Sequence, residues 1–326
     1  MGFLDDFFES RKKKSCQFTA DTAPVESLPA STELKKRISA LTVEINKRLP
    51  TSPALKLKPC RGQTTLYSSK LGGTPYFPKS MEYPKVKKGE YAGEPLYFLA
   101  QLNFAELPAV EGFPQQGILQ FFAGSKSDCV VGLDFDDGTN QNGFRVFYHR
   151  EIITDEAQLL THTDIPAHDD EEYSYPFKGE FALKAESVIR EQPSIDDFRF
   201  MKIVVDSYNT LFGTSFENVW SYEANSIGKQ DEELVDRLFE IYESINSTGT
   251  KMGGFPHFTQ FDPRANSEQG EYFDTLLFQI DDNGDDCESL EDEIMFGDCG
   301  VANFFINSEA LKNGDFTKVL YNWDCG

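Results

Sequence analysis

One segment occurs twice, and this repeat constrains the chain more than any other feature. Lys70–Phe77 and Lys251–Phe258 share a lysine, two adjacent glycines, a proline and a closing phenylalanine, about 180 positions apart. Three more pairs of similar segments follow in the same order: Gln101–Asn103 with Gln279–Asp281, Gly117–Phe122 with Gly300–Phe305, and Arg145–Tyr148 with Lys318–Tyr321. Repeated segments in a constant order indicate an internal duplication.

Periodicity predicts a helix and then several strands in each half. Ser31 precedes an apolar stripe over residues 34–49, and two more helical stripes, at 198–212 and 234–245, precede Lys251. Strand-like runs at 55–58, 97–102, 118–122 and 144–148 are separated by Gly, Pro, Asp and Asn. We therefore expect an internally duplicated α+β protein. Each half is a helix followed by a largely antiparallel β-sheet, and the two lobes pack with pseudo-twofold symmetry.

The expected domain bounds follow from this pattern. Residues 1–30 form an N-terminal segment and linker, 31–180 the first repeat lobe, and 181–326 the second, packed together as one globular unit. Within residues 1–14, Phe3, Leu4, Phe7 and Phe8 fall on one side of a short helix that precedes the basic run Arg11–Lys14. This segment predicts a short helix docked on the body or on a partner, with peripheral membrane contact as the other reading.

Composition restricts the partners. The net charge of −23 argues against nucleic acid, because phosphate binding needs clustered Lys and Arg. No apolar run reaches membrane-spanning length, and the first residues lack the order of a signal peptide. Six scattered cysteines without paired spacing predict reduced thiols. We expect a cytoplasmic protein with no cofactor and no metal.

The paired glycines admit a structural and a functional interpretation. Gly72, Gly73 and Pro75, like Gly253, Gly254 and Pro256, form turns that other residues would strain. A structural turn, repeated because the fold repeats, is favoured over a ligand-cradling loop. The spacing does not match a phosphate-binding loop.

The second copy carries the richer side chains. His257, Gln260, Asp262 and Arg264 lie within eight residues, where the first copy has Tyr76, Pro78 and Ser80. A histidine beside a carboxylate could act as a general base, and an arginine could bind an anion. We expect Asp262 and Arg264 to be scaffold and His257 to face a ligand. The full set of ligand-binding candidates is His257, Gln260, Asp262, Arg264, Gln279, Asp298, Lys70 and Gln101.

No metal or nucleophile motif stands out. The four histidines lack metal-ligand spacing, and no G-x-S-x-G elbow occurs. The acidic loop at 281–293 departs from the calcium-binding pattern, with Asp286 where glycine is needed and Asp292 in place of the closing glutamate. A hydrated hairpin loop is the favoured interpretation.

Together these motifs resemble the YwqG-like family. The residues that carry the resemblance are Lys251–Arg264, Leu276–Asp281, Gly297–Gly300, Phe304–Ile306 and Tyr321–Cys325, with Lys70–Pro78 and Pro95–Asn103 in the first half. Phe296 stands where many members have tryptophan, a departure that leaves an aromatic residue in place. The resemblance implies a bacterial-centred, cytosolic domain of unknown function without assigned catalytic residues.

The sequence therefore favours a non-catalytic binding or interaction module. Its ligand, another protein or a small molecule, would occupy a cleft between the two duplicated lobes. The alternative is a hydrolase-like enzyme that uses His257, Asp262, Arg264 and Asp298.

Overall fold

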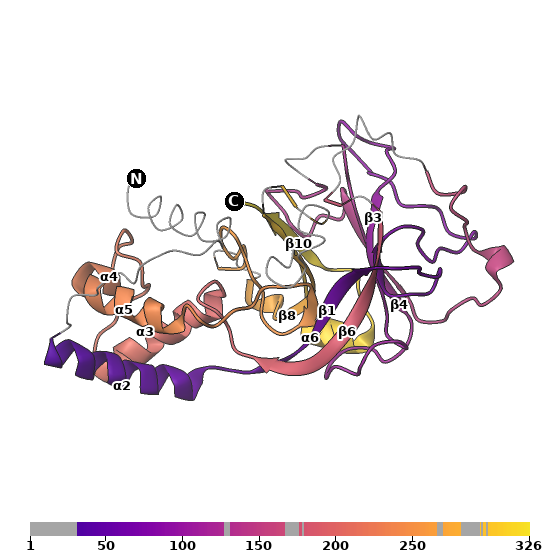
Figure 1. The fold of residues 1–326 in the computed structure, drawn as a ribbon. Coiled ribbons are helices and arrows are strands. Elements are labelled where there is room, and N and C mark those ends of the chain that lie inside the picture. The colour runs from indigo at the N-terminus through magenta and orange to yellow at the C-terminus, as the bar shows by residue number, and fades with distance from the viewer. Residues whose placement is uncertain are drawn as a thin grey trace, which may run out of the picture.

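The structure is a computed structural model that describes residues 31–126, 131–166, 176–177, 179–265, 270–281, 294, 296–297 and 299–326. Its ten strands form one antiparallel sheet that curves toward a barrel, beside a layer of helices (Figure 1). The strand order is β10-β9-β8-β7-β1-β6-β2-β3-β4-β5. The expected fold of two duplicated lobes, each a helix followed by its own sheet, is therefore wrong.

Two long strands explain the correction. β1 (Ser52–Arg61) and β6 (Glu180–Glu191) pair with each other along their length. β1 also pairs with β7 (Lys251–Gly253), and β6 pairs with β2 (Lys70–Gly72). Because the hydrogen bonding continues across this centre, the sheet is not divided into two. The domain bounds given above, residues 31–180 and 181–326, are not tested by the strand pairing and stay a prediction.

The outer strands follow the same order on both sides of the central pair. One side continues from β2 to β3 (Tyr97–Asn103), β4 (Ile118–Ala123) and β5 (Phe144–His149). The other continues from β7 to β8 (Thr275–Asp281), β9 (Val301–Ile306) and β10 (Leu320–Asp324). Lys70 lies opposite Gln101, as Lys251 lies opposite Gln279. The repeated segments thus occupy matching positions in one sheet.

The last pair of similar segments is out of register by two residues. Tyr148 lies opposite Leu119, and Trp323 lies opposite Ala302 at the corresponding place on β9. Trp323, and not Tyr321, is therefore the structural counterpart of Tyr148. The same register makes Asp324 the counterpart of His149.

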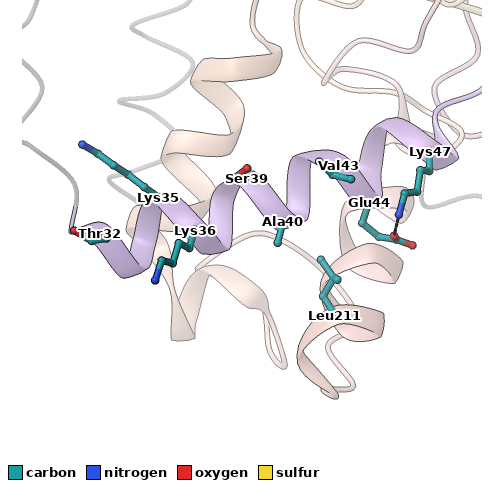
Figure 2. A pocket seen from close by; sticks show the side chains of 9 residues that line it. All are labelled: Thr32, Lys35, Lys36, Ser39, Ala40, Val43, Glu44, Lys47 and Leu211. Carbon is teal, nitrogen blue, oxygen red and sulfur yellow. Dashed lines mark hydrogen bonds and ion pairs between the residues drawn. The ribbon is translucent and has the colours of Figure 1, made fainter.

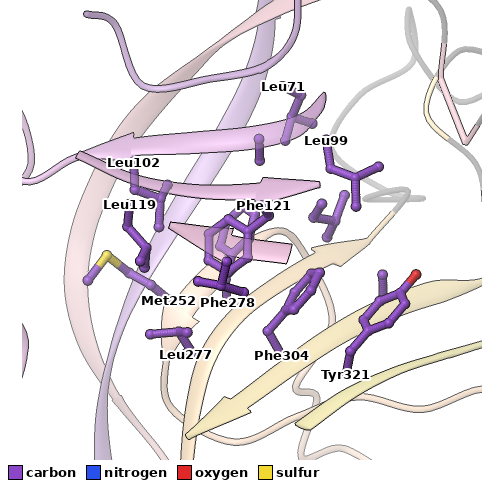
Figure 3. Close-up of a cluster of buried hydrophobic side chains, with 14 of the residues drawn as sticks. Leu71, Leu99, Leu102, Leu119, Phe121, Met252, Leu277, Phe278, Phe304 and Tyr321 are labelled. Atoms are coloured by element: carbon purple, nitrogen blue, oxygen red, sulfur yellow. The ribbon is translucent and has the colours of Figure 1, made fainter. Parts of the chain in front are cut away.

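The main core fills the concave side of the curved sheet. Phe121 of β4 lies 5.0 Å from Phe278 of β8 and 4.6 Å from Phe304 of β9, measured between ring centroids (Figure 3). Leu71, Leu119 and Leu277 are fully buried in the same cluster. The two sets of outer strands therefore bury their apolar faces against each other, which stabilises the closed curvature.

The long helices form a separate layer with its own core. α2 (Thr32–Arg48), α3 (Phe198–Phe212) and α5 (Glu232–Tyr242) bury a cluster that includes Leu41, Phe200 and Leu238. The Ser31 hydroxyl accepts from the Leu34 amide and caps α2, whose stripe was predicted from periodicity. The shorter helices are α4 (Ile227–Gln230), α6 (Ser308–Asn313), η1 (Glu156–Gln158) and η2 (Gly270–Tyr272).

Over the described ranges, no helix is both long and apolar enough to cross a membrane. Residues 1–30, which include the predicted short helix, lie outside the described residues.

Candidate functional site

A row of four polar side chains crosses the first set of outer strands. This first polar row consists of Lys70, Gln101, Gln120 and His149. Lys70 is almost fully buried, and its Nζ donates to Glu180 Oε1 at 2.9 Å. Gln101 Oε1 accepts from the Tyr76 amide at 2.9 Å, which fixes the chain just after the Gly-Gly turn.

Every amide group of the first polar row has a partner. Gln101 Nε2 donates to two backbone carbonyls, and Gln120 Nε2 donates to the carbonyl of Tyr76. Gln120 Oε1 lies 2.8 Å from His149 Nε2. Burial lowers the pKa of His149 to about 4, so the ring is neutral at neutral pH and donates from Nε2. The first polar row therefore has a structural role, because its amide groups are all hydrogen-bonded within the protein.

The second polar row occupies the matching positions: Lys251, Gln279, Asn303 and Asp324. Lys251 Nζ lies 2.8 Å from Glu191 Oε2, and burial lowers the pKa of Lys251 to about 8 although Glu191 opposes this shift. Gln279 Oε1 accepts from the His257 amide at 2.8 Å. Asn303 Nδ2 donates to the His257 carbonyl at 2.8 Å, as Gln120 does to Tyr76.

Two oxygen atoms at the far end of the second polar row are left without a hydrogen-bond donor. Asn303 Oδ1 and Asp324 Oδ1 are both buried without a hydrogen-bond partner. The neutral imidazole that supplies the donor in the first row is replaced here by a carboxylate. Asp324 Oδ2 accepts from the Gln260 amide at 2.9 Å, and burial raises the pKa of Asp324 to about 6, although hydrogen bonds from Gln260 and Thr259 oppose the shift. Two acceptors therefore stand where the first row has an acceptor and a donor.

His257 lies at the surface above this end of the row. Its side chain is 24% exposed, and Nδ1 lies 3.5 Å from Asp196 Oδ2. Burial favours the neutral ring, but Asp196, Asp281 and Asp324 together outweigh it and raise the pKa of His257. The neighbourhood of His257 is thus electronegative.

Asp262 and Arg264 form a buried ionic network that fastens this segment to α3. Arg264 Nη2 lies 2.7 Å from Asp262 Oδ2 and 3.1 Å from Asp197 Oδ2, and all three side chains are buried. Asp197 caps α3 through the Arg199 amide, and Asp262 accepts from the Phe198 amide. The Arg264 guanidinium also stacks over a phenylalanine of β9 at 4.2 Å.

The glycines of both turns adopt the left-handed backbone region expected of them. Gly72 and Gly73 have φ of 62° and 73°, and Gly253 and Gly254 both have φ of 72°. Beyond the turns, the prolines Pro75 and Pro256 lead into the segments held by Gln101 and Gln279. The paired glycines give each backbone room to approach a glutamate, Glu180 or Glu191.

The remaining candidates are placed as follows. Gln260 is exposed, and its Nε2 donates to the Cys325 carbonyl. Asp298 and residues 282–293 of the acidic loop lie outside the described residues. In the part of the chain that the structure covers, no three His, Cys, Asp or Glu side chains gather closely enough to hold a metal ion.

The candidates drawn from the sequence did not include five members of these rows or the two glutamates that bind their lysines. The missed row members are Gln120, His149, Lys251, Asn303 and Asp324, and the glutamates are Glu180 and Glu191. Asn303 could have been found, because Gly300–Phe305 was matched with Gly117–Phe122 and so paired Asn303 with Gln120. Asp324 was hidden by the two-residue error in register. The glutamates come from β6, for which no repeated partner was recognised.

A comparison with models of protein families gives a match. A family model described as Domain of unknown function (DUF1963) matches residues 69–325. No curated protein matches the chain. The match supports an uncharacterised domain family, and the narrower resemblance to the YwqG-like family stays a prediction.

Proposed function

The chain belongs to this family of domains of unknown function, and we propose that it is a non-catalytic binding module with its site at the second polar row. The ligand meets the chain beside His257, at the far end of the row, rather than in a cleft between lobes. One observation carries the proposal. Of two matching rows in one sheet, the first pairs its amides fully, whereas the second leaves Asn303 Oδ1 and Asp324 Oδ1 without donors.

The two unpaired oxygens at the far end of the second polar row favour a ligand that is positively charged and donates hydrogen bonds. Asn303 lies opposite Asn322, so Asp324, two residues further along β10, projects from the same face as a diagonal neighbour. An unpaired buried acceptor costs about 1–3 kcal/mol. A primary ammonium group offers three donors in a small head, so it can satisfy both oxygens at once. The carboxylates around His257 favour its positive charge.

A ligand would reach the far end of the second polar row from the surface, between the side chains of His257 and Gln260. The His257 ring is partly exposed. Gln260 is exposed, and its side chain donates a hydrogen bond to the Cys325 carbonyl. Movement of these two side chains opens the row from the surface, while the backbone of His257 stays held by Gln279 and Asn303.

The test uses two matched cations on the full chain. Ethylammonium carries charge and N–H donors, whereas tetraethylammonium carries charge alone. We expect ethylammonium to raise the melting temperature and to bind in calorimetry at pH 8, and tetraethylammonium at equal ionic strength to do neither.

The double variant N303Q/D324H is the internal control, because it copies the pair found in the first polar row. It should be at least as stable as the wild type and should lose ethylammonium binding. Equal binding of both cations, or binding that survives in the double variant, contradicts the proposal.

The hydrolase-like alternative has weaker support. Arg264 forms buried ion pairs with both Asp262 and Asp197, so neither Asp262 nor Arg264 is available to a substrate. The carboxylate beside the His257 ring is Asp196. A histidine and carboxylate in contact also occur in catalytic sites, so ester hydrolysis that is lost in His257→Ala would favour this alternative.

A further inference from the structure

The outer side of the helical layer holds a hollow of about 630 Å³ (Figure 2). It runs along the solvent side of α2 and is closed on one flank by Leu211 near the end of α3. The residues that line it are Thr32, Lys35, Lys36, Ser39, Ala40, Val43, Glu44, Lys47 and Leu211.

The floor of this hollow is apolar and exposed. Val43 is 54% exposed and Leu211 39%, although neighbouring positions of the same helices are buried. Apolar side chains gathered in an exposed hollow are typical of a surface that contacts something else. The fold itself does not need them there, because α2 packs on α3 and α5 through its opposite face.

The rim of the hollow is basic. Lys35, Lys36 and Lys47 surround the floor, and only Lys47 has an ionic partner among the described residues, Glu44 at 3.3 Å. The chain as a whole carries a net charge of −23. A basic rim on so acidic a protein selects an occupant that is both acidic and apolar.

Residues 3–9 of the same chain have this composition. Phe3, Leu4, Phe7 and Phe8 are apolar and have the spacing that would put them on one side of a helix, while Asp5, Asp6 and Glu9 supply three negative charges. We propose that this segment docks in the hollow along α2, with its aromatic side chains on Val43 and Leu211 and its carboxylates beside the three lysines.

The connecting chain is long enough for this docking. About twenty residues separate Glu9 from Thr32, which itself lines the hollow. A flexible linker of this length spans roughly 25 Å, and α2 from Thr32 to Lys47 is about 23 Å long. Such a tether gives an effective concentration in the millimolar range, so a weak contact suffices. Docking of residues 3–9 would withhold the hollow from other acidic partners.

The experiment uses the full chain with p-benzoylphenylalanine in place of Phe7. After irradiation, we expect crosslinks within one chain to α2 or to the Leu211 region, identified by mass spectrometry. The variant K35E/K36E should reduce this crosslink at least fivefold. K184E, which reverses an exposed lysine on β6, should leave it unchanged. The melting temperatures of both variants should match that of the wild type, because Lys35, Lys36 and Lys184 are all exposed.

Four outcomes overturn the proposal. Crosslinks to another surface, or crosslinks that charge reversal does not reduce, exclude the hollow as the docking site. Crosslinks found only between two chains assign the hollow to a second copy. Cosedimentation with phosphatidylserine vesicles that K35E/K36E abolishes, without a crosslink to the hollow, assigns it to a membrane surface.

Discussion

At the scale of single residues, the two copies of the Gly-Gly segment use their shared side chains in the same way. Lys70 and Lys251 each bind a glutamate of β6, and Gln101 and Gln279 each hold the backbone amide that follows the proline. The repeat made these residues easy to find in the sequence. Their partners were harder to find, because Glu180 and Glu191 lie far from the lysines along the chain and belong to no repeated segment that was recognised.

Arg264 is the residue whose removal should cost most stability. Arg264→Ala leaves the buried carboxylates of Asp262 and Asp197 without their shared cation. We expect a loss of about 3–5 kcal/mol in the free energy of unfolding, measured by urea denaturation. Lys202→Ala is the matched control, because its ion pair with Glu271 is exposed to solvent and should contribute little to stability. Equal losses in the two variants would show that the network is not buried.

Asp324 should make stability depend on pH. Because burial raises the pKa of Asp324 to about 6, the folded chain keeps a proton that the unfolded chain releases near pH 4. This contribution is fully present below pH 4 and is lost as pH rises through 6. Relative to Asp324→Asn, the wild type should lose roughly 3 kcal/mol between pH 4 and pH 7.

The control for this titration is Asp315→Asn. Hydrogen bonds from Thr317 lower the pKa of Asp315, which is exposed, so its small contribution grows as pH rises. The immediate neighbour of Asp324 that also titrates is His257, whose raised pKa adds to the same trend in both proteins. A wild-type curve parallel to that of Asp324→Asn would refute the assignment.

At the scale of elements, apolar runs predicted individual strands well and their grouping badly. The runs at 97–102, 118–122 and 144–148 became β3, β4 and β5. β6 was missed, because residues 184–190 are exposed and alternate too weakly to signal a strand. Without β6, the link between the two sets of strands could not be predicted, and each set was assigned a sheet and a helix of its own.

The two Gly-Gly turns provide a matched pair of substitutions. Gly73 and Gly254 both have φ above 70°, so alanine costs about 1–2 kcal/mol at either position. A Cβ at Gly254 would lie 2.2 Å from Glu191 Oε2, and Glu191 is buried and held by Lys251. A Cβ at Gly73 would lie 2.5 Å from Glu180, whose side chain also binds a lysine, Lys70, but is 36% exposed and so has more room to move than Glu191.

Gly254→Ala should therefore destabilise the protein more than Gly73→Ala, by a further 1–3 kcal/mol or so of steric strain. Thermal unfolding followed by circular dichroism measures both. The reverse order would mean that the Glu180 contact is the tighter of the two.

At the scale of the whole molecule, the central strand pair makes the two halves depend on each other. β1 comes from the first half of the chain and lies between β6 and β7 of the second. A fragment of residues 181–326 lacks the strand that joins its own sheet, and a fragment of residues 31–180 lacks β6. Periodicity along one chain carries no information on such long-range pairing, which explains why two lobes were expected.

Neither fragment should fold alone. We expect residues 31–180 and 181–326, produced separately, to show no cooperative thermal transition, and the coexpressed pair to recover one. Two fragments that each unfold cooperatively would favour independent lobes over the shared sheet.

The central claim is that the second polar row lacks a donor which a ligand supplies, and a crystal structure with ethylammonium at pH 8 tests it most directly. We expect the nitrogen to lie at hydrogen-bond distance, about 2.7–3.2 Å, from both Asn303 Oδ1 and Asp324 Oδ1. Density for a single buried water bridging the two oxygens, unchanged by ethylammonium, would contradict it.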